Sequence, residues 1–517
     1  MKRYIYTIVA FAAMLASCSQ DAELNEVIDN QPMDITQVGA TTWAATRAAV
    51  DATDNTIVNW QAGDALSVFS STSAAGGSKF TTTSTRTAGI FNIVADQPTI
   101  SAVTAMMYPY QATATWYNDN SKLTCEIPSV QSATKGSFDK AAAIMYNIGS
   151  DTEPTLTYAV NFLKVTVNEG NVHSICISSS KELSGKMEIT SNAISPVSGS
   201  SLNSVVLVAP ANKVLEPGDY YIAVKKGDIL SPEISYTYYN TANHTATVKT
   251  KAGSSTISFS SGKNVKPISV DFSKGSVTSR NAVQLWTDGP YFAQFNVGAT
   301  ITDYSEANKD YSVSDNNNTA DLGGIYCWGG LTDFRYEGST GDYYSGSIVS
   351  GFVLPIYNDV ASVFWGSNWE IPTNNCIQKL FTGILNYNRN FDMVESVILG
   401  IPQEGTYVDW TWCNGSTVQY VTGCTLSGFK ISGKDDYVGN NIFIPFTGAR
   451  DPNLTYTYNN HRFASYWFST CEDNTTYPQF FSFRRSSGGI PHIEIYWQHF
   501  EYATEALYGR AIRAVLK

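Results

Sequence analysis

The stretch Ala159-Val160-Asn161-Phe162-Leu163-Lys164-Val165-Thr166-Val167 decides the fold class of this chain of 517 residues. It is apolar and β-branched with isolated polar residues, which is typical of a buried strand. Short runs of the same kind recur between about residues 56 and 270, each bounded by turn residues. They include Ala65 to Phe69, Val205 to Val208 and Tyr220 to Val224. No apolar stripe of helical period accompanies them, so we expect a mainly β protein built from antiparallel β-sandwiches.

Composition shifts along the chain predict where its domains end. A polar break near residues 150–156 divides the strand-rich region into two units, 48–155 and 156–275. A second polar stretch, residues 275–280, is short and has the composition of a linker. Eight of the eleven tryptophans follow it, so residues 281–517 are expected to form a separate domain that folds alone. One helix is expected there, at about Asn374 to Asn386, with Thr373 as its N-cap.

The N-terminus has the three parts of a secretory signal peptide. Lys2 and Arg3 precede an apolar run that is too short to span a bilayer, and Leu15-Ala16-Ser17-Cys18 ends the segment. This ending resembles a bacterial lipobox, which implies cleavage after residue 17 and a lipid on Cys18. Residues 18–47 are polar with little periodicity, and we interpret them as a tether or propeptide. The expected location is the outer membrane, at the cell surface.

Charge and cysteine usage narrow the classes of partner. The net charge of -12 argues against nucleic acid. No apolar run after Cys18 reaches the length of a membrane span, so the lipid on Cys18 would be the only membrane attachment. Besides Cys18 an odd number of cysteines remains, and their spacing matches no zinc motif. Cys413 and Cys424 could close a local disulfide loop, or both could be unpaired thiols. No metal and no cofactor are expected.

Residues 48–273 resemble the fimbrillin family, the pilin-like proteins of Bacteroidales. The matching pieces keep their order over the whole region. They are Asn59-Trp60-Gln61-Ala62-Gly63-Asp64, Gly89-Ile90-Phe91, Met107-Tyr108-Pro109-Tyr110, Ile127-Pro128-Ser129-Val130-Gln131, Leu156 to Val167, Ala209-Pro210 and Leu215-Glu216-Pro217-Gly218-Asp219-Tyr220. The resemblance implies two tandem transthyretin-like β-sandwiches. It also implies proteolytic processing between Arg47 and Ala48 by an arginine-specific protease, and donor-strand exchange with other pilin subunits.

Residues 281–517 resemble an α+β C-type-lectin-like domain of the kind found in relatives of sulfatase-modifying factors. Motifs along the domain carry this resemblance. They are Phe295-Asn296-Val297-Gly298-Ala299, Tyr326-Cys327-Trp328-Gly329, Gly366-Ser367-Asn368-Trp369-Glu370-Ile371-Pro372-Thr373, Ile444 to Arg450, Tyr466 to Thr470 and Tyr508 to Val515. The calcium-sugar motifs of animal C-type lectins and the paired-cysteine site of formylglycine-generating enzymes are absent from the sequence. The resemblance therefore supports a fold, without a calcium-dependent sugar site or an oxidase activity.

Catalytic motifs are not found in the sequence, and no catalytic residue is predicted. Tyr407, Trp410 and Trp412 are candidates for an aromatic platform on which a sugar ring stacks, although a core position suits each of them as well. Trp369 and Trp467 are assigned to the core. Asp451 and Asn453 lie in a loop whose oxygens could bind a ligand or calcium, and Ser314 to Asn318 form a similar loop; ordinary solvated turns explain both. His492 and His499 could form a metal pair or be ordinary polar positions.

Two classes of function follow from these observations. The first is a binding protein: an accessory or tip pilin whose lectin-like domain acts as an adhesin toward a host or microbial glycan or protein. A lipid-anchored surface glycan-binding protein that never polymerises is a variant of the same class. The second class is a cell-surface enzyme related to sulfatase-modifying factors, against which the absent cysteine pair argues.

Overall fold

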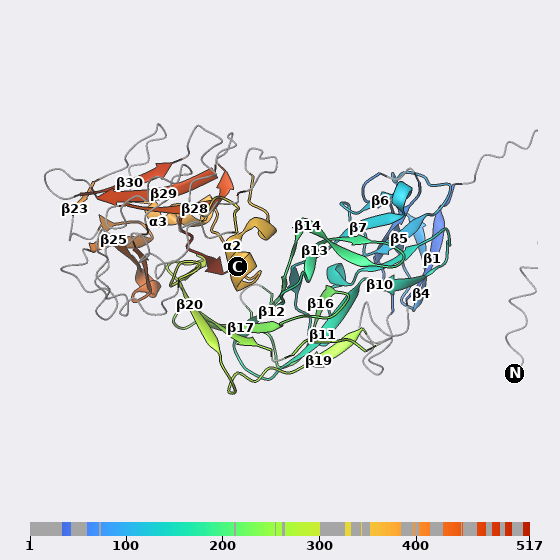
Figure 1. Ribbon diagram of the computed structural model, residues 1–517, viewed down its shortest axis with the longest axis horizontal. Coiled ribbons are helices and arrows are strands. Elements are labelled where there is room, and N and C mark those ends of the chain that lie inside the picture. Colours follow the sequence, from blue (N-terminus) through green and yellow to red (C-terminus); the bar gives the residue numbers. More distant parts are fainter. Residues whose placement is uncertain are drawn as a thin grey trace, which may run out of the picture.

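A computed structural model shows a mainly β protein (Figure 1), which confirms the predicted class. Of the residues that the structure describes, 49% lie in strands and 7% in helices. The structure describes residues 34–42, 59–71, 74–210, 213–253, 255–260, 264–299, 326–331, 343, 352–383, 396–398, 403–413, 428–445, 447, 463–471, 478–485, 492–498 and 510–516. The strands of the N-terminal region and those of the C-terminal region lie at opposite ends of the molecule, joined by a long curved sheet (Figure 1).

The N-terminal end is a closed barrel. Its strands, in spatial order, are β1 (Gln37–Thr42), β10 (Thr155–Tyr158), β9 (Met145–Ile148), β5 (Ala105–Tyr108), β2 (Ala65–Phe69), β3 (Ser78–Thr82) and β4 (Ala88–Ile93). A second sheet packs beside the barrel and shares its core. It contains β6 (Thr115–Tyr117), β7 (Lys122–Ile127), β13 (Ser184–Ile189) and β14 (Ile194–Leu202). Because β13 pairs with β7, the predicted boundary near residue 155 does not separate the first two units cleanly.

Strand β11 (Val160–Val167) is the centre of the next part of the fold. It pairs with β16 (Gly218–Lys225) and runs parallel to β19 (Val265–Ile268). Its side chains alternate between two cores, as the period of a strand requires. Phe162 packs in the core of the barrel, whereas Leu163 and Val165 pack in the core of the second unit.

A long sheet continues from the second unit into the C-terminal region. Its order is β22 (Trp369–Glu370), β31 (Val515–Leu516), β21 (Tyr291–Ala293), β20 (Thr278–Gln284), β18 (Thr245–Ala252), β17 (Glu233–Asn240), β12 (Val172–Ser178), β15 (Ser204–Val208) and β8 (Val130–Ser132). We call it the long sheet. The predicted linker is wrong at its C-terminal end, because Thr278, Ser279 and Arg280 belong to β20 and pair with β18. Polar side chains suit this strand because its first residues are half exposed or exposed.

The described parts of the C-terminal region add two smaller sheets and two short helices. One sheet has the order β23 (Ser396–Ile398), β30 (His492–Gln498), β29 (Pro478–Arg485) and β28 (Phe463–Cys471); the other has β24 (Gln403–Glu404), β25 (Val408–Cys413), β26 (Gly428–Gly433) and β27 (Asn441–Pro445). The helices are α2 (Val360–Trp365) and α3 (Asn374–Phe381), and two described 3-10 turns accompany them, η5 (Ile356–Asn358) and η6 (Asp435–Tyr437). The N-terminal region has the 3-10 turns η1 (Asn118–Asn120) and η2 (Lys140–Ala142).

Both helices begin at a capping side chain. The predicted N-cap Thr373 is confirmed, since its hydroxyl accepts from the Cys376 N–H, although α3 ends earlier than expected. Helix α2 was not predicted. Its cap is Asp359, which is only 3% exposed and also accepts from the N–H of Ile371 at 2.7 Å. This one carboxylate therefore fixes both the start of α2 and the main chain directly after β22.

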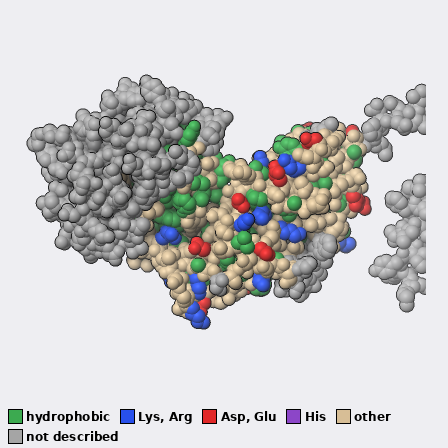
Figure 2. All heavy atoms as spheres, in the orientation of Figure 1, with side chains coloured by type: hydrophobic (Ala, Val, Ile, Leu, Met, Phe, Trp, Pro, Cys, Tyr) green, Lys and Arg blue, Asp and Glu red, His purple; other side chains and the backbone are tan. Residues whose placement is uncertain are grey.

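Hydrogen bonds and apolar contacts tie the second unit to the C-terminal region. The Asn440 amide donates to the carbonyl oxygens of Asn243, His244 and Gln284 at 2.9, 3.3 and 3.0 Å. One apolar core contains Val248 of β18 together with residues of the C-terminal region such as Trp369. Figure 2 shows hydrophobic side chains gathered on the described surface beside the C-terminal region. The two parts share a sheet and a core, so they are not joined by a linker alone.

Candidate functional site

Strand β1 closes the barrel. It is antiparallel to β4 from Gln37 to Thr41 and parallel to β10 at Thr41 and Thr42. In the described part of the chain, β4 and β10 are joined only through β1. If β1 were withdrawn, the barrel would become an open sheet with two unpaired edges. We call the position between β4 and β10 the β1 slot.

Main-chain hydrogen bonds hold β1 on both sides of the slot. On the β10 side, the N–H groups of Gly39 and Thr41 donate to the carbonyls of Thr152 and Pro154 at 2.8 and 3.0 Å. On the β4 side, the Thr42 N–H donates to the Thr87 carbonyl at 3.1 Å. Such bonds require an extended chain and an N–H at each donating position, but no particular side chain.

The inward side chains of β1 are small. Burial alternates along the strand, so Val38, Ala40 and Thr42 face the core while Gly39 and Thr41 are only partly buried. Residues 18–47 were predicted to be a tether throughout, and this is wrong for residues 37–42. Small residues give a weak apolar signal, which hides the strand in the sequence; the alternation of Val38, Ala40 and Thr42 is the signal that could have revealed it.

Trp60 covers the centre of β1 from inside the barrel. Its side chain is fully buried, and its indole N–H donates to the Ala40 carbonyl at 3.0 Å. The indole lies against Gly89, which is the cross-strand partner of Ala40 on β4. A Cβ atom on Gly89 would stand 2.6 Å from the Trp60 ring, so this position has no room for a side chain. Phe91 and Tyr108 pack edge-on against the same indole.

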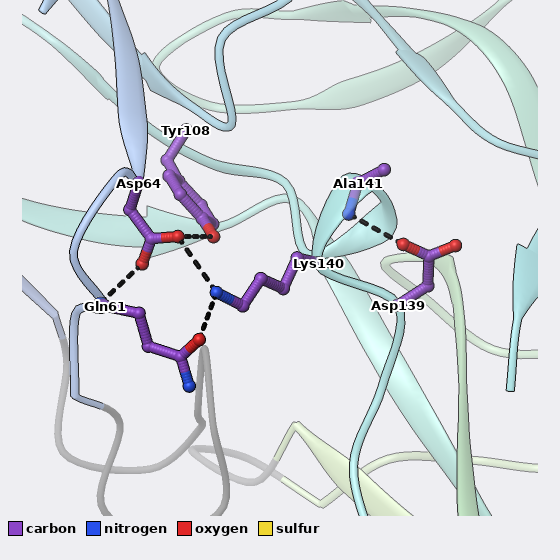
Figure 3. A network of polar contacts seen from close by, with 6 residues as sticks. All are labelled: Gln61, Asp64, Tyr108, Asp139, Lys140 and Ala141. Carbon is purple, nitrogen blue, oxygen red and sulfur yellow. Dashed lines mark hydrogen bonds and ion pairs between the residues drawn. The ribbon is translucent and has the colours of Figure 1, made fainter. Parts of the chain in front are cut away.

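A polar network fixes the turn that carries Trp60 (Figure 3). The Asp64 carboxylate accepts from the Gln61 N–H at 2.8 Å, from the Tyr108 hydroxyl at 3.3 Å and from the Lys140 ammonium at 3.2 Å. Lys140 also donates to the Gln61 side chain, which ties η2 to this turn. Burial, with a smaller effect of the Asp64 charge, raises the pKa of Tyr108 well above its usual value, so its hydroxyl stays a donor. The motif Asn59 to Asp64 therefore sets the position of the indole.

The predicted processing point follows β1 directly in the chain. Residues 43–58 connect β1 to the turn at Trp60 that precedes β2. Arg47 and Ala48 lie in this connection, which is outside the described residues. A cut between Arg47 and Ala48 would end the covalent connection between β1 and the rest of the barrel. The main-chain hydrogen bonds, the hydrogen bond from the Trp60 indole and the small buried side chains described above would then retain the strand without a covalent link.

The predicted aromatic platform is not formed at Trp410. This side chain is fully buried in the C-terminal core, and its indole N–H donates to the Leu380 carbonyl at 2.8 Å, so the assignment to a ligand site is wrong. Tyr407 is partly buried and packs against the same core, with the Lys379 ammonium 5.3 Å from its ring centre. Trp412 lies in β25, but its side chain falls outside the described residues, as do Asp451 and Asn453. The core assignments of Trp369 and Trp467 are confirmed.

Other predicted chemistry finds little support in the described parts of the chain. No group of three or more potential metal ligands occurs among the residues that the structure describes. His492 lies in β30, whereas His499, the loop from Ser314 to Asn318 and Cys18 lie outside the described residues. Four described cysteines are free thiols, namely Cys125, Cys176, Cys376 and Cys471. Cys413 lies at the end of β25, whereas Cys424 lies outside the described residues. Burial raises the pKa of Cys125 and Cys176 to about 12, which keeps both thiols protonated and unreactive.

No family model fits the chain, and no curated protein is significantly similar to it. Within the described ranges, no helix is both long and apolar enough to cross a membrane. Among the described residues, the β1 slot is the site that the geometry defines best, because its hydrogen bonds, its inward side chains and its covering indole are all in place.

Proposed function

We propose that this protein is a surface-anchored, pilin-like accessory or tip subunit that accepts a strand of another subunit in the β1 slot. In this proposal the first two units correspond to the tandem units of a fimbrillin, the first of them closed as a barrel by β1, and the lectin-like C-terminal domain acts as the adhesin. The lipid on Cys18 holds the precursor at the outer membrane. Cleavage at Arg47 separates the barrel from this anchor and frees β1 to leave.

The position of β1 carries the proposal. This strand closes the barrel, yet it precedes Arg47 in the chain, so a single cut makes it a separate peptide. A vacant slot would expose the edges of β4 and β10 together with the apolar core beneath them. Unpaired strand edges of this kind recruit another strand, which restores the hydrogen bonds and covers the core.

The C-terminal region supports a terminal place in an assembly. Strands β20 and β31 lie C-terminal to the second unit, and each pairs with strands of the same chain. Neither strand is free to leave its sheet without breaking a core. The described part of the chain therefore offers a slot that receives a strand, whereas its later strands are engaged within the molecule.

Fibre incorporation tests this proposal. Arg47→Ala should keep the chain folded but exclude it from fibres, because β1 then stays attached. Arg86→Ala is the matched control, since Arg86 is an exposed arginine of the same barrel and its loss should leave incorporation unchanged. The measurement is immunogold labelling of sheared fibres, with a thermal melt of each purified variant. Normal labelling with Arg47→Ala would contradict the proposed cleavage.

One observation favours a second candidate function. The uncut barrel is closed, and β1 is paired on both sides, so the chain needs no partner strand to complete its fold. This suits a lipid-anchored surface binding protein that never polymerises. In that case the fibre fraction should contain neither the unmodified protein nor either arginine variant, while all three remain on the cell surface.

A further inference from the structure

We infer that the β1 slot selects its partner strand by size, accepting only glycine or alanine at the position of Ala40. This inference rests on the proposed function and names the partner's chemistry: an extended segment with a small residue at its centre and modest side chains two positions before and after it. The slot would then distinguish among donor strands that form identical main-chain hydrogen bonds.

The geometry around Ala40 gives the steric reason. Directly opposite side chains in antiparallel strands have Cβ atoms about 4.5–5.5 Å apart, so a side chain at position 40 extends over position 89. Position 89 is a glycine, and the Trp60 ring lies where its Cβ would be. A leucine or valine in place of Ala40 would therefore meet the indole. The indole has little freedom to move, because Phe91 and Tyr108 pack against it.

The flanking positions impose different requirements. Val38 and Thr42 also face the core, so these two positions accept moderate side chains. At positions 39 and 41 the strand must donate an N–H to the carbonyls of Thr152 and Pro154, which excludes proline there. The side chain at position 41 is only partly buried and faces away from the indole, so a larger residue should be tolerated at Thr41.

Peptide binding to a trimmed protein tests the inference. A site-specific protease sequence is placed within residues 43–58 of the full chain, the chain is cut, and β1 is released in mild denaturant and removed. Synthetic peptides of residues 34–42 are then titrated: the native sequence, Ala40→Leu, and Thr41→Leu as the matched control. We expect the Ala40→Leu peptide to bind about tenfold more weakly or worse, since overpacking a core costs this much, and the control to bind like the native peptide.

A protein variant identifies the residue responsible. Trp60→Leu shortens the side chain above the slot, so the Ala40→Leu peptide should regain most of its affinity. If Trp60→Leu fails to fold, the peptides on the unmutated protein decide alone. Equal binding of the native and Ala40→Leu peptides would overturn the size rule while leaving the proposed function intact. If no peptide bound at all, the slot would not accept strands, and the proposed function itself would fail.

Discussion

Replacing Trp60 with phenylalanine should weaken the hold of the barrel on β1. The substitution removes the indole N–H that donates to the Ala40 carbonyl and leaves a smaller ring against Phe91 and Tyr108. A buried neutral hydrogen bond contributes about 1 kcal/mol, and the missing ring atoms should cost roughly 1–2 kcal/mol more. We therefore expect the free energy of unfolding of the uncut chain to fall by about 2–3 kcal/mol.

Only the hydrogen-bond part of this loss acts on β1 itself. In a chain cut within residues 43–58, a loss of about 1 kcal/mol corresponds to roughly fivefold weaker retention of the β1 peptide. Retention can be followed by native mass spectrometry after dilution of the cut protein. The uncut chain gives the global cost by chemical denaturation.

Trp410→Phe is the matched control for this prediction. Trp410 is also a fully buried indole that donates to a main-chain carbonyl, that of Leu380, but it lies in the C-terminal region. Its substitution should lower global stability by a similar amount and leave β1 retention unchanged. The reasoning would be refuted if both variants retained β1 equally well, or if Trp410→Phe released it.

Three further predictions concern the rest of the fold. A fragment of residues 281–517 should lack a cooperative melt, because it loses β18, which is the partner of β20. The fragment also loses Val248 of β18, whose burial alone contributes about 1.5–3 kcal/mol to the shared core. Calorimetry of the fragment and the full chain checks this, and a cooperative melt of the fragment would show that the shared core is dispensable. Asp359→Ala should destabilise the C-terminal region by about 2–4 kcal/mol, because it leaves buried N–H groups without an acceptor. Asp359→Asn keeps one oxygen and should cost less. Denaturation midpoints compare the two variants, and equal costs would argue against the capping role. Burial lowers the pKa of His173, against a smaller opposing effect of its hydrogen bond to the Lys213 carbonyl, so the folded state disfavours the charged ring. The free energy of unfolding should therefore fall as the pH drops below about 6.5, and His173→Gln should reduce this dependence. A pH profile of the melting temperature that is unchanged in the variant would contradict this prediction.

The local elements of this fold were predictable from the sequence. The run from Ala65 to Phe69 is β2, and the stretch around Val160 to Val167 is β11. Their apolar and β-branched residues predict buried strands even when the partner strand is unknown. The N-cap of α3 was equally visible, because a threonine before a helical run has a local reason to be there.

Pairings between distant segments were not predictable from local patterns. Strand β1 alternates, but its inward residues are small and give a weak apolar signal, and β20 begins with polar residues, so neither is conspicuous as a strand in the sequence. Each is a strand because of the edge that it pairs with, β4 for β1 and β18 for β20. The pairing of β7 with β13 likewise joins two units that the sequence separates by a polar break. Which distant strands pair is decided by the partner strand and its register, and a local sequence pattern does not contain either.

The candidate site was foreseen only in part. Arg47 marks the predicted cleavage point, but the strand that such a cut would release was predicted to be a tether. The aromatic platform illustrates the opposite error. Strand β25 alternates, and its tryptophans could face either the core or the solvent; the structure places Trp410 in the core. Composition alone cannot distinguish the two faces of a strand that is rich in aromatic residues.

Hydrogen exchange of the β4 amides in the trimmed protein tests the central claim most directly. In the intact chain β4 pairs with β1 along its length, so its amides should exchange slowly. After cleavage within residues 43–58 and removal of β1, we predict that the β4 amides that face β1 lose protection, while the β4 amides that face β3 and the amides of β2, which pairs with β3 and β5, keep theirs. Adding the peptide of residues 34–42 should restore the protection of the amides that face β1. Protection of these amides that persists without β1 would mean that the barrel closes on itself, and would contradict a slot open to a partner strand.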